Sequence, residues 1–160
     1  MITFEKFEER DIEVLTPILK RAFDEDTRIH LNRPEGGPEG YANGEFLRKW
    51  AFHEGVTSFK ILVDGKTAGS TFLWINPQTH VNFLGNVYLD VVYQNQGLGQ
   101  QVWEKIEALY PDTRVWQTET PGFSRRNHYF YVMKCGFKIV RIENPRDLLE
   151  ANYIFEKVMQ

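Results

Sequence analysis

Apolar and polar residues alternate or recur at regular intervals along most of the chain, and these intervals predict its secondary structure. Residues 1–9 alternate, which predicts a first strand. From Asp11 to about Phe23 the apolar residues recur at helical spacing, so we expect a helix with Asp11 as its N-cap. A segment rich in Pro, Gly and Asn follows at residues 32–45, and a second helix is expected over residues 45–54.

The middle of the chain predicts three successive strands. Residues 57–75 hold two strand patterns separated by Asp64 and Gly65, a dipeptide that favours a tight hairpin turn. After a short turn, the apolar run at residues 81–92 predicts a third strand. We therefore expect these three strands to be antiparallel neighbours.

The last part of the chain alternates between helices and strands. An apolar stripe with a period of 3.6 begins after Gly97, and Pro111 ends that helix. Further elements are expected at residues 113–120 (strand), 123–136 (short helix), 137–142 (strand) and 151–159 (strand). The order β-α-α-β-β-β-α-β-α-β-β predicts an α/β protein with a mixed sheet flanked by helices.

Length and composition limit the class of protein. The chain has 160 residues, of which 42% are hydrophobic and 26% charged, so we expect one folded domain over residues 1–160. The formal net charge is -3, which gives no electrostatic sign of a nucleic-acid or membrane partner. A single cysteine, Cys135, excludes an internal disulfide. With no signal peptide and no apolar segment of membrane-spanning length, the expected location is cytoplasmic.

Two groups of polar residues are expected to be ordinary surface features. The acidic run Asp24-Glu25-Asp26 is interpreted as a solvated helix end or loop, with attraction of a cationic substrate as the alternative. The four histidines have no i,i+4 pairing with one another and no cysteine cluster nearby, so we expect surface histidines and no metal site.

Candidate chemistry begins at the stretch QNQGLG, which lies where a strand pattern changes into a helix pattern. Its two glycines, Gly97 and Gly99, permit unusual backbone conformations and a close approach by another group. The first turn of a helix presents unpaired N–H groups and favours negative charge. The stretch therefore predicts either a cradle for phosphate groups or simply a tight turn.

A family resemblance appears when this stretch is combined with a second one. Residues 94–99 (QNQGLG) resemble the Q/R-x-x-G-x-G/A signature of the GNAT superfamily of acyl-CoA-dependent N-acyltransferases. Residues 127–140 (NHYFYVMKCGFKIV) resemble that family's second landmark, an Asn followed by an aromatic-Tyr pair and a Gly-Phe. The resemblance implies a mostly antiparallel sheet of about seven strands and four helices, splayed between the fourth and fifth strands.

The resemblance also implies a substrate and a set of binding residues. Acetyl-CoA would be the acetyl donor, with its pyrophosphate at the glycine turn and its pantetheine arm along the fourth strand, where a bulge would widen the slot. Asn127 is expected either to hydrogen-bond that arm or to cap a helix. The positions assigned to the coenzyme are Leu89, Asp90, Val91, Gln94, Asn95, Gln96, Gly97, Leu98, Gly99, Gln100 and Asn127.

Transfer of the acetyl group to an amine requires an oxyanion contact and an acid for the departing thiolate. The resemblance implies a backbone N–H near Leu89 or Val91 for the first role and a tyrosine for the second. The usual spacing before Gly-Phe would select Val132, so Tyr131 fits only if its helix holds one extra residue or bulges. Tyr129 and a solvent proton are the alternatives.

The general base is sought among carboxylates on the two strands that splay apart. Glu119 lies where the fifth strand should diverge and is expected to be a base or substrate ligand, whereas Asp90 is expected to have a structural partner. The resemblance thus implies an N-acetyltransferase acting by direct transfer in a ternary complex. The acceptor would be a small-molecule amine or a peptide N-terminus, and the protein a possible homodimer.

Two other functions are compatible with parts of the pattern. A coenzyme-binding sensor without catalysis would keep the fold and the pocket. A dinucleotide-binding oxidoreductase would use a similar glycine turn, with Glu119 about twenty residues beyond Gly99 as the ribose ligand. Against the oxidoreductase, Val102 replaces the third glycine and hairpins precede the motif.

Overall fold

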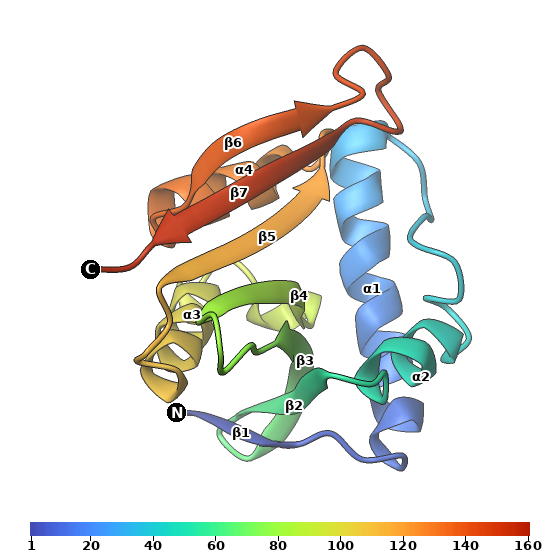
Figure 1. Cartoon of the computed structure of the whole chain (residues 1–160). Helices are drawn as coiled ribbons and strands as arrows, with labels where there is room; N and C mark the ends of the chain where they lie inside the picture. The colour runs from blue at the N-terminus through green and yellow to red at the C-terminus, as the bar shows by residue number, and fades with distance from the viewer.

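The computed structural model describes residues 1–160 and has the expected order of elements (Figure 1). Seven strands form one sheet: β1 (Ile2–Lys6), β2 (Val56–Val63), β3 (Lys66–Trp74), β4 (Val81–Leu89), β5 (Val115–Pro121), β6 (Lys138–Glu143) and β7 (Asn152–Val158). The α-helices are α1 (Asp11–Leu31), α2 (Glu45–Ala51), α3 (Leu98–Leu109) and α4 (Arg125–Tyr129). A 3₁₀ turn, η1 (Val91–Tyr93), follows β4, and a π-helical turn, η2 (Phe130–Lys134), follows α4.

The sheet consists of two halves that diverge where β4 meets β5. The strand order is β1-β2-β3-β4-β5-β7-β6, and only β4 and β5 are parallel. Their pairing runs from Val81 opposite Val115 to Leu84 opposite Thr118 and then ends. Beyond this point β5 diverges from β4 toward the end of α1 (Figure 1). The expected antiparallel strands and the splay between the fourth and fifth strands are therefore confirmed.

A bulge in β4 lies directly beside this junction. Phe72 of β3 pairs with Asn86 and Leu73 pairs with Leu84, which leaves Gly85 as the extra residue. A Cβ at Gly85 would lie 2.2 Å from a ring carbon of Trp74, so only glycine fits there. A bulge bends its strand and increases its twist. It therefore turns the second half of β4 away from β5.

Helices cover both faces of the sheet, and each face has its own core. Phe72 packs with α1 and α2, whereas its neighbour Leu73 belongs to the core under α3 and η2. Because successive side chains of a strand point to opposite faces, α1 and α2 lie on one face and α3 and η2 on the other. None of the helices combines the length and the apolar character needed to span a membrane.

The first helix differs from the expectation in length and in its cap. It continues past Phe23 to Leu31, because its polar second half is held by contacts with the following segment. Asp24, for example, accepts hydrogen bonds from the Tyr41 hydroxyl and the Gly36 N–H. The interpretation of the acidic run as a solvated segment is wrong, since the Asp24 side chain is only 17% exposed.

Asp11 is not the N-cap that the sequence predicted. Arg10 occupies the cap position, and Asp11 is the first helical residue. One carboxylate oxygen of Asp11 accepts the Glu8 N–H at 2.7 Å, and the other accepts from the Lys60 ammonium of β2 at 3.0 Å. The side chains of Asp11 and Lys60 are 9% and 11% exposed. This buried ion pair joins the start of α1 to the sheet.

We expect Lys60→Met to lower the free energy of unfolding by about 3 kcal/mol, because it leaves the Asp11 carboxylate buried without its cation. Urea denaturation monitored by circular dichroism measures the change. Lys66→Met is the matched control, since Lys66 is exposed on the same hairpin, and it should change stability by less than about 0.5 kcal/mol. Equal stabilities for the two variants would contradict the structural role of the pair.

Candidate active site

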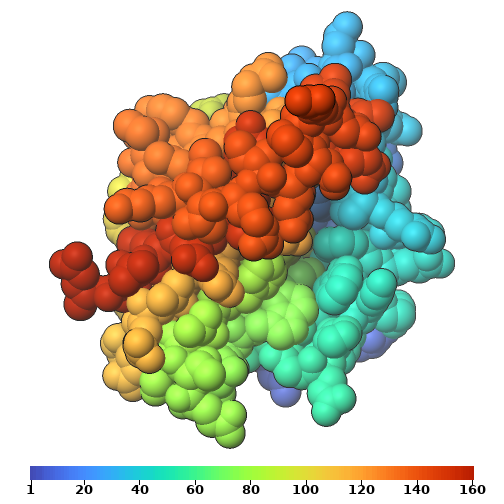
Figure 2. All heavy atoms as spheres, turned by 45° about the horizontal axis from the view of Figure 1, so that its top comes forward, coloured from blue at the N-terminus to red at the C-terminus, as the bar shows by residue number.

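A cavity of about 1510 Å³ lies where β4 and β5 diverge. Its wall includes the second half of α1, the segment after α1, the end of β4, the start of α3, the end of β5 and the α4–η2 region. Leu149 and Glu150, in the turn between β6 and β7, also line it. Figure 2 shows the surface of this turn (red-orange) against the end of α1 (light blue). The cavity therefore reaches from the α3 side of the sheet to the α1 side.

Most of the residues expected at the site line this one cavity. They are Leu89, Gln94, Asn95, Gly97, Gly99, Gln100, Glu119, Asn127 and Tyr131, together with the alternative tyrosine Tyr129. Four other expected positions, Asp90, Val91, Gln96 and Leu98, are not part of its wall. The structure thus brings together residues that are far apart in the sequence, from β4, α3, β5 and η2.

The start of α3 is open toward the cavity. Gly97 is the N-cap in the left-handed conformation, with φ of 77°, and no side chain caps the helix. No atom lies within 4 Å of the place where a Cβ of Gly97 would be. The first turn contains no acidic residue. Its unpaired N–H groups and the positive end of the helix dipole favour an anion here.

Two glutamine side chains brace the turn that leads into α3. The Gln94 side-chain amide donates to the Leu89 carbonyl at 3.0 Å, and the Gln96 amide donates to the Val92 carbonyl at 2.8 Å. On the far side, Gly99 packs against Phe130, whose ring carbon would lie 3.1 Å from a Cβ at Gly99. The turn is therefore fixed by contacts with both β4 and η2.

Beyond the junction, one edge of β4 has no partner strand. The Asp90 N–H donates to the Ala68 carbonyl of β3 at 2.7 Å. Because backbone groups alternate in direction along a strand, those of Val87 and Leu89 face the opposite way, toward the slot left by β5. The Leu89 N–H is thus directed to the slot, as an oxyanion contact requires.

Asp90 instead connects the end of β4 to α1. Its two carboxylate oxygens accept hydrogen bonds from Arg21 at 2.9 and 2.7 Å. The Arg21 guanidinium, helped by the Val91 N–H, holds the pKa of Asp90 below its usual range. A carboxylate held in this way is poorly suited to accept a proton from an amine.

The helix that carries Tyr131 bulges, as its unusual spacing requires. In η2 the Cys135 N–H donates to the Phe130 carbonyl at 3.1 Å, an i to i+5 bond that accommodates one extra residue. Tyr131 is 7% exposed and packs against Phe130, Phe137 and Phe155. The bulge therefore places the tyrosine, and not Val132, among the residues that line the cavity.

The Tyr131 hydroxyl lies near the junction of β4 and β5. It faces the Thr118 side chain, which partly offsets the effect of burial on the pKa of Tyr131. Thr118 in turn donates from its hydroxyl to the Leu84 carbonyl at 2.8 Å, across the last paired position of the two strands. Burial raises the pKa of Tyr131 well above its usual value, so the phenol stays protonated.

Asn127 and Glu119 also take definite positions. Ser124 is the N-cap of α4 and Asn127 lies within that helix, so the alternative that Asn127 caps a helix is wrong. The Asn127 side-chain amide donates to the Thr120 hydroxyl at 3.1 Å. Glu119 is exposed on β5, lines the cavity and makes no ion pair or hydrogen bond through its side chain. Its carboxylate is free to bind a substrate or a proton.

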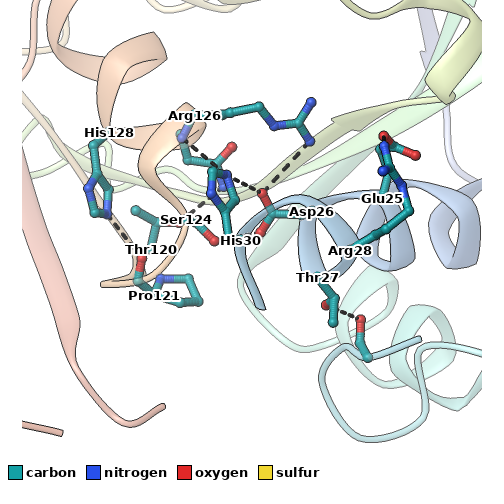
Figure 3. A network of polar contacts seen from close by, with 12 residues as sticks. Glu25, Asp26, Thr27, Arg28, His30, Thr120, Pro121, Ser124, Arg126 and His128 are labelled. Atoms are coloured by element: carbon teal, nitrogen blue, oxygen red, sulfur yellow. Dashed lines mark hydrogen bonds and ion pairs between the residues drawn. The ribbon is translucent and has the colours of Figure 1, made fainter. Parts of the chain in front are cut away.

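Sequence reasoning missed a polar cluster on the α1 side of the cavity, formed by Asp26, His30, Ser124 and Arg126 (Figure 3). The Ser124 hydroxyl donates to Asp26 at 2.6 Å, and the Arg126 N–H donates to His30 Nε2 at 3.4 Å. The His30 side chain is 4% exposed, so the expectation of a surface histidine is wrong. A longer first helix would have revealed the i,i+4 spacing of Asp26 and His30 on one face.

Comparison with known proteins identifies a family, a curated relative and solved structures that this chain resembles. The profile of the acetyltransferase (GNAT) family matches residues 18–137. The uncharacterized protein YrkN of Bacillus subtilis (strain 168) is 48% identical over 90 residues, which cover 56% of this chain and 49% of that protein. The chain therefore spans about half the length of this curated relative.

Solved structures resemble the fold over almost the whole chain. The PaiA N-acetyltransferase from Thermoplasma acidophilum, in complex with coenzyme A, has a TM-score of 0.76 and 16% identity, covering 99% of both chains. The ribosomal-protein-S18-alanine N-acetyltransferase from Escherichia coli has a TM-score of 0.72 and 20% identity, covering 98% of this chain and 92% of that one. The divided sheet is thus shared with these proteins, and by the match over residues 18–137 this chain belongs to the acetyltransferase (GNAT) family.

Proposed function

We propose that this protein is an N-acetyltransferase that transfers the acetyl group of acetyl-CoA directly to a primary amine, with both substrates bound together. The observation that carries the proposal is the junction of β4 and β5, where an open helix start, a free strand edge and a buried tyrosine line one cavity. The family match supports it. So does the PaiA enzyme, a structural neighbour that was solved with coenzyme A.

The donor substrate fits the α3 side of this cavity. Its pyrophosphate would lie against the first-turn N–H groups of α3 beside Gly97, where no Cβ obstructs it. Its pantetheine arm has amide groups that can pair with the free edge of β4 at Val87, in the way an added strand does. Asn127 lines the same passage. The cradle relies on backbone groups, so it requires no lysine.

The acceptor amine would enter from the α1 side of the sheet. There the cavity is lined by the segment after α1 and by the exposed carboxylates of Glu119 and Glu150. An ammonium group must lose one proton before its nitrogen can attack. Glu119 lies on β5, in the cavity wall, and its carboxylate makes no ion pair or hydrogen bond. We assign Glu119 the role of proton acceptor, directly or through water.

In the transfer step, the amine lone pair attacks the thioester carbon and the carbon–sulfur bond breaks. The Leu89 N–H, directed to the slot, would stabilise the negative charge that develops on the thioester oxygen. Tyr131 would give its phenolic proton to the departing thiolate, and the proton released by the amine would restore it through solvent. The Tyr131 phenol is protonated at neutral pH and so holds the proton that this step needs.

Binding of the donor is the first test. We expect calorimetry to show saturable binding of acetyl-CoA and none of NAD. Gly97→Ala should weaken acetyl-CoA binding at least tenfold, because a Cβ would enter the cradle and φ of 77° is strained for alanine. Gly65→Ala is the matched control, with φ of 81° and open space around it, and should lose similar stability but keep its affinity. Equal affinities in the two variants, or binding of NAD, would overturn the donor site.

Measurement of turnover tests the role of Tyr131 as the general acid. Tyr131→Phe should lower kcat by about 10²-fold, the usual contribution of a positioned acid, and leave KM for acetyl-CoA within about twofold. Thiol release is measured with spermidine and with a peptide that begins with alanine as amines. Tyr129→Phe is the control, since Tyr129 lines the same cavity but is 58% exposed. Unchanged kcat in Tyr131→Phe with a loss in Tyr129→Phe would move the role to Tyr129.

Two variants that each neutralise one carboxylate test the role of Glu119 as the general base. Glu119→Gln should reduce kcat/KM for the amine by about tenfold or more at pH 7, because the amine then loses its proton only to bulk solvent. Glu150→Gln removes the same charge from the same cavity and should have less than a threefold effect, through attraction of the ammonium alone. Similar losses in both variants would show an electrostatic role and exclude a specific base.

A further inference from the structure

We infer that Asp26 and His30 are positioning residues of the proposed active site, because from α1 they cap α4 and so hold Asn127 and Tyr131 at the open junction of the sheet. This inference rests on the proposed function. Neither residue touches the reacting atoms in this scheme. Both act through the helix that begins at Arg125 and continues into η2.

The start of α4 lacks a cap from its own sequence. The N-cap residue is a serine, which usually accepts a hydrogen bond from the first turn, yet Ser124 makes no such bond. Its hydroxyl instead donates to Asp26 at 2.6 Å. The first-turn N–H of Arg126 is accepted by His30 Nε2 at 3.4 Å. Residues almost a hundred positions away therefore supply the cap (Figure 3).

The side chains that form this cap are largely shielded from solvent, and its two hydrogen bonds are partly buried. The side chains of His30 and Asp26 are 4% and 15% exposed, and Ser124 is 1% exposed. A buried backbone N–H that loses its partner costs about 1–3 kcal/mol. Removing the His30 side chain would thus leave the Arg126 N–H without an acceptor and allow the start of α4 to move.

The bond to Arg126 requires a particular protonation state of His30. The same atom, His30 Nε2, lies 3.4 Å from the Arg126 N–H and 3.4 Å from Asp26 Oδ1. A hydrogen bond from the Arg126 N–H needs a lone pair on Nε2, whereas a hydrogen bond to Asp26 Oδ1 needs a proton on Nε2. Asp26 Oδ1 has no hydrogen-bond partner while Nε2 serves as an acceptor, although it lies 3.8 Å from the Arg126 guanidinium; His30 Nδ1, which then carries the proton, also has no partner. Protonation of His30 would therefore transfer the bond from α4 to Asp26.

The surroundings favour neutral His30 at neutral pH, and the cap requires the tautomer with its proton on Nδ1. Burial lowers the pKa of His30, and the positive charges of Arg125 and Arg126, with His128, lower it further, against the opposing effect of Asp26. The cap is thus intact above the ordinary histidine pKa of about 6.5 and is lost as the pH falls through the lower value that applies in the folded protein.

Movement of α4 would reach the donor site directly. Asn127 follows Arg126 in the same helix and lines the cavity, and Phe130 packs against Gly99 at the start of α3. Tyr131 lies one residue further along. If only a fraction of the molecules hold α4 in place, the apparent affinity for the donor is the intrinsic affinity multiplied by that fraction.

The test is calorimetric binding of acetyl-CoA between pH 5.5 and 7.5, which requires no knowledge of the acceptor. At pH 7.5 we expect His30→Ala to bind about fivefold more weakly than the wild type, as the loss of a cap implies. His30→Gln keeps a side-chain oxygen that can accept the Arg126 N–H but cannot titrate, so it should bind within twofold of the wild type. His53→Gln, an exposed histidine outside the cavity, is the control.

The ratio of affinities between the wild type and His30→Gln isolates the effect of His30. Phosphate groups titrate near pH 6, but they and His128 contribute equally to both proteins, so their effects cancel in the ratio. We expect the wild type to become about fivefold weaker than His30→Gln at pH 5.5. A constant ratio, or wild-type affinity in His30→Ala, would overturn the inference and leave the proposed function intact. Absence of binding to the wild type would overturn both.

Discussion

The end of the pairing between β4 and β5 is the constraint on which the site depends. Two parallel strands that stayed paired would close the sheet and leave no room for a substrate between them. Here the last pair is Leu84 and Thr118, and the bulge at Gly85 turns β4 away immediately afterwards. Because of this divergence, backbone groups of β4 remain without a partner strand, a side chain from η2 can reach the junction, and the cavity can pass from one face of the sheet to the other.

The two faces of the sheet then divide the chemistry. On the α3 side, the groups that face the cavity at the start of α3 and the edge of β4 are mostly backbone groups, set in place by glycines and by two glutamine side chains. On the α1 side, the wall consists of charged and polar side chains from a helix, an irregular segment and the β6–β7 turn. A backbone site depends on conformation, whereas a side-chain site depends on residue identity. The α1 side of the cavity can therefore vary in sequence while the α3 side keeps the same backbone groups.

Local patterns predicted most of the fold and part of the site. The hairpin at Asp64 and Gly65 and the glycine turn before α3 followed from short-range chemistry, and both are present. The spacing around Tyr131 suited the family pattern only if the helix held an extra residue or bulged, and the structure contains such a bulge as η2. The length of α1 could not be predicted from local patterns, because its second half is polar and is stabilised by contacts with the segment that follows it. Asp26 and His30 were missed for this reason, since their partners, Ser124 and Arg126, are remote in the sequence.

The length of α1 also has a mechanical consequence. One turn of this helix is attached to the end of β4 through Arg21 and Asp90, and a later turn is attached to the region after β5 through Asp26 and Ser124. The helix thus acts as a strut across the opening between the two halves of the sheet. The halves cannot move apart without tilting α1 or breaking one of these attachments, so the width of the opening is set by a rigid element that lies outside it.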